Sequence, residues 1–233
     1  MASGTVVLSP HFDDAVLSCW HVLSSERDVV VVNVFAEPPP PGTPLTRWDR
    51  LTGAFDPVER VHERIAEDAA ALALVGRTAV ALPFVERQYA GTLPPLEDVV
   101  TALTALDAAE VFAPAGIGDH SAHVLVRDAA LQLDRRLTFY ADIPYATAFG
   151  WPAWVSGGER AALLDVDADW EEALEAMRAD YRPRAIRLSP EQQGRKVEAM
   201  RTYRTQFAAL EAGGQRRLTH PDLIAWEVVW ERR

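Results

Sequence analysis

Two short segments of the chain hold most of the side chains that can do chemistry. The first runs from Ser9 to Asp14 and places His11 close to two adjacent carboxylates, Asp13 and Asp14. Adjacent carboxylates repel each other unless a cation or separate roles keep them apart. A helix N-cap explains one aspartate, but it does not explain a histidine beside both. The segment therefore indicates a cation site.

The second segment runs from Gly116 to His123 and contains a second pair of histidines, His120 and His123. Three of the six histidines thus fall in two short stretches. Two imidazoles and one carboxylate supplied by two loops are typical of a catalytic zinc that keeps one position open for water. Iron(II) or another divalent ion also suits such a ligand set.

The surrounding pattern explains how these segments can meet. Short, β-branched runs predict buried parallel strands, at Thr5–Ser9, Val29–Phe35, Thr78–Leu82, Glu110–Ala113 and Leu137–Tyr140. Helical periodicity separates them, at Asp13–Ser24, Val58–Val75, Leu96–Leu106 and Ser121–Leu133. This alternation predicts a Rossmann-like, doubly wound α/β fold, with both segments at the carboxyl edge of one mostly parallel sheet.

The chain is expected to form a single domain, with an α/β core over residues 1–150 and a C-terminal α+β extension over 151–233. In the extension, Arg160–Val166 predicts a strand, Trp170–Asp180 and Pro190–Leu210 predict helices, and Leu223–Trp230 is compatible with either. The long connection 36–57 is either a binding loop or a rigid excursion.

Composition narrows the classes of partner. The formal charge of −11 disfavours contact with phosphate backbones, so nucleic-acid binding is not expected. No apolar run is long enough to cross a bilayer, and the N-terminus does not resemble a signal peptide. The single cysteine, Cys19, excludes an internal disulfide and suits a reducing compartment. We expect a cytoplasmic protein without membrane insertion, and homo-oligomer formation is left open.

The two segments resemble the motifs of the LmbE/PIG-L zinc-dependent N-deacetylases. The family's Pro-His-Pro-Asp-Asp matches residues 10–14, and its His-x-Asp-His matches residues 120–123. The Arg-x-x-Glu-Asp helix matches residues 64–68, and the acidic-x-Pro-Tyr segment matches residues 142–145. The Lys…Tyr…Gln helix resembles the stretch from Lys196 through Tyr203 to Gln206, so the resemblance covers nearly the whole chain.

This resemblance implies a role for each matched residue. His11, Asp14 and His123 would bind Zn²⁺, Asp13 would be the general base, and His120 would face the developing oxyanion. Arg64 would contact the substrate, which is expected to be a small N-acetylated molecule such as an amino-sugar conjugate. A bound zinc ion lowers the pKa of water from about 15.7 toward about 7, and a positioned base adds about 10²- to 10⁴-fold in rate.

The sequence also departs from the family at informative positions. Ala122 replaces the aspartate that is expected to orient the neighbouring histidine, so His120 is expected to be neutral unless Asp119 or Asp142 takes over. Trp20 and His21 replace a glycine pair in the first helix; we expect Trp20 in the core and His21 on a helix face. Phe12 replaces a proline.

Other residues offer weaker hypotheses. Arg47 and Arg87 are alternatives to Arg64 as pocket residues, and Trp48, Trp151 and Trp154 could stack on a sugar or form loop core. Two rival functions also remain: an amidase of the same fold that cleaves another N-acyl or thiol-conjugate substrate, and a metal-binding protein without turnover. The motifs alone do not separate them.

Overall fold

The computed structural model describes residues 4–148, 150–157, 166–175, 177, 180–213 and 218–233. The strands are β1 (Thr5–Ser9), β2 (Val29–Asn33), β3 (Ala79–Ala81), β4 (Glu110–Pro114), β5 (Arg136–Tyr140), β6 (Tyr181–Arg187) and β7 (Trp226–Arg232). The α-helices of the first half are α1 (Asp14–Ser18), α2 (Trp20–Leu23), α3 (Arg47–Leu51), α4 (Pro57–Ala73), α5 (Arg87–Ala90), α6 (Leu96–Thr104) and α7 (Ser121–Ala130). The remaining helices are η1 (Tyr145–Thr147, a 3₁₀ turn), α8 (Ala153–Ser156), α9 (Val166–Ala173), α10 (Pro190–Met200), α11 (Phe207–Gly213) and α12 (Pro221–Ile224).

The strands form one seven-stranded sheet in the order β3-β2-β1-β4-β5-β7-β6. The first five are parallel neighbours, whereas β7 runs antiparallel to both β5 and β6. The chain winds outward from β1 in both directions, so the predicted doubly wound, mostly parallel α/β fold is confirmed. The order reverses between β1 and β4, which is where ligands bind in open sheets of this kind.

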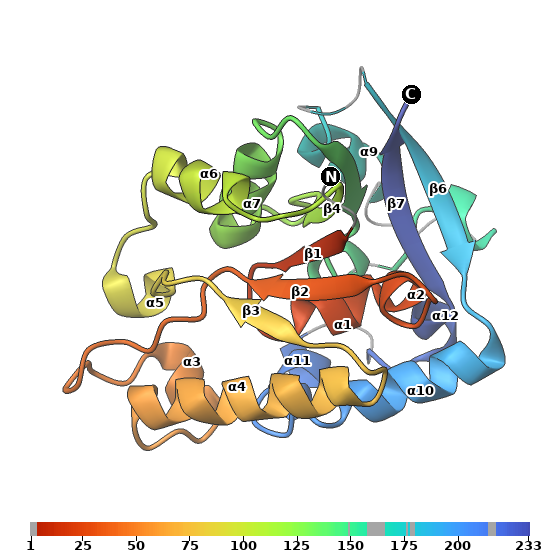
Figure 1. Cartoon of the computed structure of the whole chain (residues 1–233). Coiled ribbons are helices and arrows are strands. Elements are labelled where there is room, and N and C mark those ends of the chain that lie inside the picture. Colours follow the sequence, from red (N-terminus) through yellow and green to blue (C-terminus); the bar gives the residue numbers. More distant parts are fainter. Residues whose placement is uncertain (1–3, 149, 158–165, 176, 178–179, 214–217) are drawn as a thin grey trace.

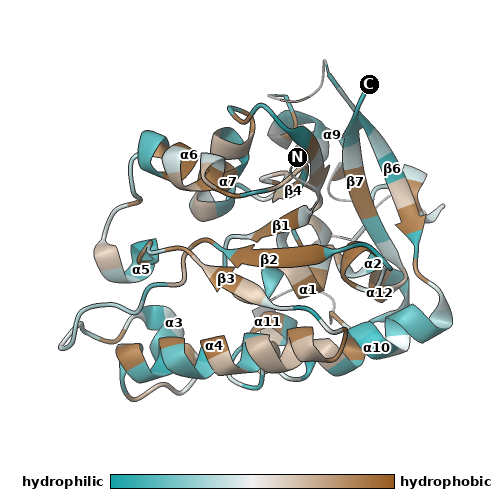
Figure 2. Cartoon of the chain, viewed as in Figure 1, coloured by the Kyte–Doolittle hydropathy of each residue, from teal (hydrophilic) through white to brown (hydrophobic). Residues whose placement is uncertain are grey.

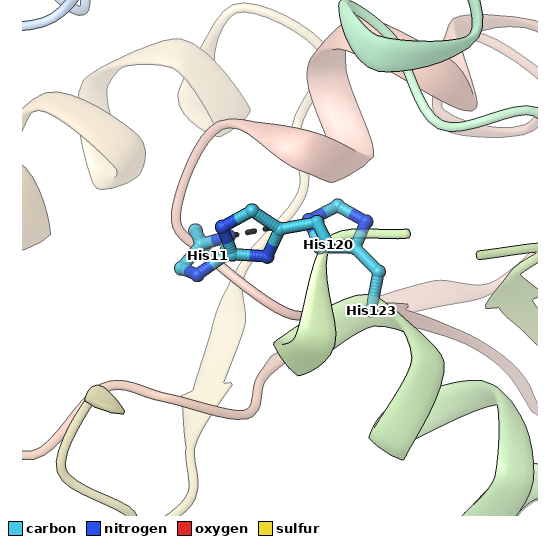
Figure 3. A group of neighbouring side chains, drawn as sticks. All are labelled: His11, His120 and His123. Atoms are coloured by element: carbon cyan, nitrogen blue, oxygen red, sulfur yellow. Dashed lines mark hydrogen bonds between the residues drawn. The ribbon is translucent and has the colours of Figure 1, made fainter. Parts of the chain in front are cut away.

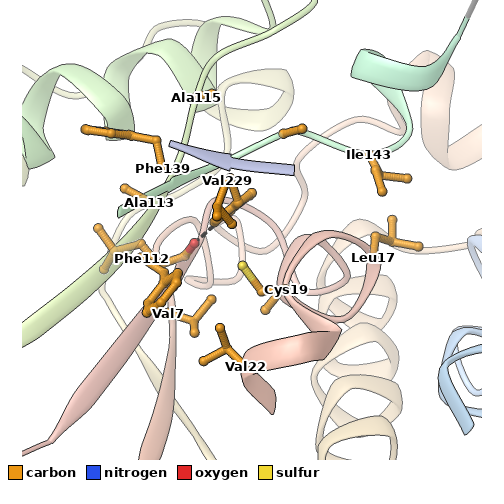
Figure 4. Close-up of a cluster of buried hydrophobic side chains, with 14 of the residues drawn as sticks. Val7, Leu17, Cys19, Val22, Phe112, Ala113, Ala115, Phe139, Ile143 and Val229 are labelled. Carbon is orange, nitrogen blue, oxygen red and sulfur yellow. Dashed lines mark hydrogen bonds between the residues drawn. The ribbon is translucent and has the colours of Figure 1, made fainter. Parts of the chain in front are cut away.

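Helices cover both faces of the sheet (Figure 1): α6 and α7 lie on one face, and α1, α2, α4 and α10 lie on the other. Strands β1 and β2 are mostly hydrophobic, while hydrophilic residues are frequent in α4 and α10 (Figure 2). In the core, side chains of β1, β4, β5 and β7 meet those of α1 and α2, with Cys19 among them (Figure 4). Cys19 is fully buried, as expected, and burial raises the pKa of its thiol.

The predicted first helix is wrong in one respect, because it is broken at Cys19 into α1 and α2. The carboxylate of Glu227, on β7, accepts the backbone N–H groups of Trp20 and His21 at 2.8 and 2.9 Å. The first N–H groups of a helix have no partner within the helix. Because Glu227 accepts these two N–H groups, α2 can begin as a separate turn after Cys19. Trp20 lies in the core, as predicted, and is fully buried.

The predicted helices at 58–75, 96–106 and 121–133 are found as α4, α6 and α7, with bounds that differ by up to three residues. The helix predicted at Trp170–Asp180 is displaced, because α9 begins at Val166 and ends at Ala173. Residues 190–210 form two helices, α10 and α11, and not one. The predicted strand at 160–166 falls almost entirely outside the described residues. The ambiguous segment 223–230 ends α12 and then forms most of β7. Strand β6 was not predicted. It is an edge strand that alternates exposed arginines with few apolar residues, and it is held by antiparallel pairing with β7.

Within the described part of the chain, no helix is both long and apolar enough to cross a membrane.

Candidate active site

His11 and Asp14 are placed by the sharp turn that connects β1 to α1. The Oδ2 atom of Asp14 accepts the backbone N–H of His11 at 2.7 Å, so the two side chains are fixed relative to each other. The Ser9 hydroxyl tightens the same turn by accepting the backbone N–H of Ala15 at 3.0 Å. Figure 3 shows that His11 comes from this turn, while His120 and His123 come from the start of α7. The two sequence segments therefore converge at the edge of the sheet, as predicted.

Three polar atoms form a nearly equilateral triangle there. The Nδ1 atom of His11 lies 3.2 Å from Oδ2 of Asp14, and Nε2 of His123 lies 3.3 Å from each of these two atoms. A tetrahedral ion with bonds of about 2.0–2.1 Å requires its ligand atoms to be about 3.3 Å apart. The spacing of these atoms therefore fits a divalent metal ion without rearrangement.

The far side of each imidazole also faces a carboxylate. Asp142 Oδ1 lies 2.7 Å from Nδ1 of His123, and Glu86 Oε1 lies 3.7 Å from Nε2 of His11. Histidines that bind metals almost always present their second ring nitrogen to such a partner, which fixes the ring and makes the free nitrogen more basic. Sequence reasoning missed Glu86. It considered Asp142 only as a partner of His120, and that assignment is wrong because the carboxylate reaches His123.

The charges of this cluster are strongly coupled. Burial alone would raise the pKa of Asp14, but His123 and His11 hold it well below its ordinary value. Burial alone would lower the pKa of His123, but Asp14 and Asp142 raise it to about 10. A compact group of opposite charges with so little solvent is typical of a functional site.

His120 stands next to this triangle without a carboxylate partner. It offers a ring nitrogen within 4.8 Å of candidate atoms of His11 and His123, and its buried Nδ1 has no hydrogen-bond partner among the described residues. Burial, followed by the nearby His11 and His123, lowers the pKa of His120 to about 4. This shift favours the neutral form of the imidazole, which is the direction expected from Ala122.

Asp13 and Arg64 lie at the same site. Burial raises the pKa of Asp13, although the Arg64 guanidinium opposes the shift with Nη2 at 3.6 Å from Oδ1. The guanidinium also lies over the ring of Phe12, 5.4 Å from its centroid. Arg64 comes from α4, so a helix on one face of the sheet contributes this residue to the site (Figure 1).

A cavity of about 580 Å³ opens to solvent beside this site and is lined by His11, Asp13, Asp14, Arg64 and His120, a size typical of small-molecule sites. The fully buried His123 is not among its lining residues. Further wall residues of the cavity include Trp48, Glu86, Arg87, Tyr145 and Leu210. Trp48 is held by a hydrogen bond from its indole N–H to Gln206, so the 36–57 connection forms a wall of this cavity. Arg47, Trp151 and Trp154 are not among the lining residues; Trp151 belongs to the core instead.

Other residues that match the family motifs do not line the cavity, but they form hydrogen bonds that hold the segments around it. Tyr203 Oη lies 2.7 Å from Asp68 Oδ1 and 3.1 Å from the carbonyl oxygen of Phe12. Glu67 accepts the backbone N–H and the hydroxyl of Thr205. His21, predicted on a helix face, contacts Glu227 through Nδ1 at 2.6 Å and does not line the cavity.

Comparison with solved structures identifies the fold. Teicoplanin deacetylase Orf2, in a zinc-inhibited form, matches with a TM-score of 0.72 and 22% identity over 98% of both chains. The A40926 pseudoaglycone deacetylase Dbv21 matches with a TM-score of 0.71 and 25% identity over 100% of this chain and 98% of its own. This chain has the LmbE/PIG-L deacetylase fold.

A more distant structure agrees. The N,N′-diacetylchitobiose deacetylase from Pyrococcus horikoshii matches with a TM-score of 0.51 and 14% identity over 91% of this chain and 76% of its own. No family model matches the sequence, and no curated protein matches it either. The resemblance expected from the motifs is therefore confirmed by these structural neighbours.

Proposed function

We propose that this chain is a metal-dependent N-deacetylase that removes an acetyl group from the nitrogen of an amino-sugar conjugate. The observation that carries the proposal is the triangle of His11, Asp14 and His123, whose edges of 3.2–3.3 Å match the ligand spacing of a tetrahedral ion. We assign these three residues as the metal ligands, most simply for Zn²⁺.

The neighbouring residues supply the other functions that amide hydrolysis requires. A divalent ion at the triangle would polarise the amide carbonyl and make water nucleophilic at neutral pH. Asp13 lies in the same cavity, and its raised pKa suits a base that accepts a proton from water and passes it to the leaving nitrogen. His120, whose pKa is lowered, would donate a hydrogen bond to the developing oxyanion.

The cavity also suits the proposed substrate class. Arg64 and Glu86 offer charged partners for hydroxyl groups, and the ring of Trp48 offers an apolar face. The structural neighbours carry the names of deacetylases for teicoplanin, the A40926 pseudoaglycone and diacetylchitobiose. These names support a sugar-bearing substrate, and the open cavity leaves space for a larger conjugate beyond the sugar.

The test measures acetate release together with metal content. The purified chain is stripped with a chelator and reloaded with one equivalent of Zn²⁺ or Fe²⁺, and it is then assayed on N-acetylglucosamine conjugates. Because one structural neighbour was obtained in a zinc-inhibited form, excess zinc is assayed separately. We expect hydrolysis by the wild-type chain, and we expect Asp13→Ala to abolish it while the metal is retained.

Asp107→Ala is the matched control, because Asp107 is exposed and lies outside the cavity. This variant should keep full activity. Stoichiometric metal binding without hydrolysis across a broad panel of N-acetylated and other N-acylated compounds would contradict the proposal and favour a binding protein. Failure to bind any divalent ion would contradict the ligand assignment itself.

A further inference from the structure

His120 differs from the other two histidines of the site in how its ring is held. His11 and His123 each face a carboxylate, whereas the buried Nδ1 of His120 has no hydrogen-bond partner among the described residues. Ala122, which is 1% exposed, replaces the expected aspartate. Asp142 does not compensate, because its two oxygens are used by His123 and by the backbone N–H groups of residues 116 and 117.

An aromatic ring occupies the space beside His120 instead. The rings of Tyr145 and His120 lie with centroids 5.0 Å apart and planes inclined by 32°. Tyr145 also meets His123 edge-on, at 5.2 Å and 80°. Offset and edge-to-face contacts at these distances are the preferred arrangements of aromatic pairs.

The chain is built to bring Tyr145 close to the loop that carries His120. Gly118 has a φ of +87°, and a Cβ atom added there would lie 2.6 Å from the Cβ of Tyr145. On the other side, the carbonyl oxygen of Asp142 accepts the backbone N–H of Ala146 at 2.7 Å, which fixes the turn that begins at Tyr145. The segment that follows β5 therefore supplies one partner to each histidine of α7: Asp142 to His123, and Tyr145 to His120.

We propose that Tyr145 is a positioning residue that holds the His120 ring in place by stacking, in the role that a carboxylate would otherwise fill. The inference rests on the proposed function in one respect, namely that His120 faces the reacting carbonyl. It assigns the role to the ring of Tyr145, and the hydroxyl group is not required.

Kinetics separate the ring from the hydroxyl. In Tyr145→Leu, the ring is lost and His120 is no longer fixed, so we expect kcat to fall about tenfold to a hundredfold with little change in KM or metal content. Tyr145→Phe restores the ring and should recover most of the lost kcat. If Tyr145→Phe is as impaired as Tyr145→Leu, the hydroxyl acts directly and the inference is wrong. Unchanged kcat in Tyr145→Leu also overturns it.

A spectroscopic measurement tests the stacking without any substrate. The ring C–H signals of His120, assigned by their loss in His120→Asn, should be shifted upfield by the Tyr145 ring in the metal-loaded wild-type chain. They should move downfield in Tyr145→Leu and stay in place in Tyr145→Phe. Tyr181→Leu is the control, because Tyr181 packs on Phe139 in the core and its loss should leave these signals unchanged.

The two hypotheses fail in different ways. If the wild-type chain releases no acetate, the proposed function is wrong, but the His120 signals still decide whether the stacking exists. If acetate is released and the signals do not respond to Tyr145→Leu, only the inference fails. Should Tyr145→Leu not fold, Tyr145→Met, which has a longer and more adaptable side chain than leucine and no ring, replaces it in both experiments.

Discussion

Asp142 lies 2.7 Å from His123 through a carboxylate oxygen and the ring Nδ1, and neither side chain is exposed to solvent. The second oxygen of Asp142 accepts the backbone N–H groups of Gly116 and Ile117 at 2.8 and 3.0 Å. One buried carboxylate thus fixes the orientation of a proposed metal ligand and also the loop that precedes it. The same contact leaves Nε2 of His123 directed at Asp14 and His11.

We predict that Asp142→Asn weakens metal binding about 10- to 100-fold, which is the usual cost of losing a carboxylate behind a ligating histidine. The amide keeps the shape of the side chain but removes the charge that makes the imidazole a stronger ligand. Competition with a chromophoric chelator measures the affinity. The control is Asp128→Asn, at a half-exposed position of α7, the helix that carries His123. This variant should bind metal normally. Equal affinities of Asp142→Asn and the wild-type chain would contradict the prediction.

The position of Arg64 leads to a second prediction. Its guanidinium lies 5.4 Å from the centroid of Phe12 and 3.6 Å from the carboxylate of Asp13. Phe12→Leu keeps apolar packing against Ala36 and Val61 but removes the aromatic face, which contributes about 1 kcal/mol to such a contact. We expect KM to rise roughly fivefold with a smaller change in kcat, measured by steady-state hydrolysis.

Phe207→Leu provides a matched loss of an aromatic ring for this experiment. Phe207 packs on the main core from α11 and is not among the residues that line the cavity. Its substitution should lower stability without raising KM. A rise in KM in both variants would show that general loosening of the fold, and not the Arg64 contact, is responsible.

The convergence of His11, Asp14 and His123 could be predicted because parallel strands with right-handed crossovers bring their carboxyl ends to one edge. Each of these residues follows a strand that the sequence predicts as a buried apolar run. Glu86 and Asp142 were harder to assign. Glu86 follows β3 and Asp142 follows β5. Residue spacing within these two segments does not indicate which histidine each carboxylate contacts.

The break at Cys19 and the strand β6 have a similar cause. The break depends on Glu227, which comes from the last strand of the chain and has no local signal near Cys19. Strand β6 carries exposed arginines where a buried strand would carry apolar residues, and its pairing with β7 is what defines it. Local sequence patterns predict elements that bury their own apolar face, and they do not predict elements that are set by a distant partner.

Asp68 leads to a prediction about pH. Burial raises its pKa to about 7, although hydrogen bonds with Asn33 and Tyr203 oppose the shift. Because the pKa in the folded state is above the ordinary value of 3.8, the folded chain binds this proton more tightly than the unfolded chain. The contribution of Asp68 to stability is therefore fully present below about pH 4 and is lost as the pH rises through 7.

The measurement is the free energy of unfolding in urea at several pH values between 4 and 8, with a chelator present throughout. The wild-type chain should lose stability as the pH rises over this range, and Asp68→Asn should remove part of that loss. Relative to the wild-type chain, the free energy of unfolding of the variant should therefore be highest at pH 8. Asp98→Asn, at an exposed position of α6, is the control and should run parallel to the wild-type chain. Parallel curves for Asp68→Asn would contradict the assignment.

The buried ion pair of Lys196 and Glu227 leads to the last prediction. The two charged atoms lie 2.5 Å apart with almost no exposure to solvent, and the same carboxylate caps α2 through Trp20 and His21. Burial alone would raise the pKa of Glu227, but Lys196 and His21 hold it at about 2. Since the folded pKa is below the ordinary value of 4.5, this stability is present above about pH 4.5 and is lost as the pH falls toward 2.

Lys196→Met leaves the Glu227 charge buried without its partner, which costs about 3–5 kcal/mol. We therefore expect a large fall in the free energy of unfolding at pH 7, measured by urea denaturation. The double variant Lys196→Met/Glu227→Gln removes both charges and should recover part of the loss, because the amide keeps an oxygen for one of the two backbone N–H groups of α2. Recovery decides between two causes of the defect: an uncompensated charge is relieved by the second substitution, whereas lost packing around the lysine side chain is not.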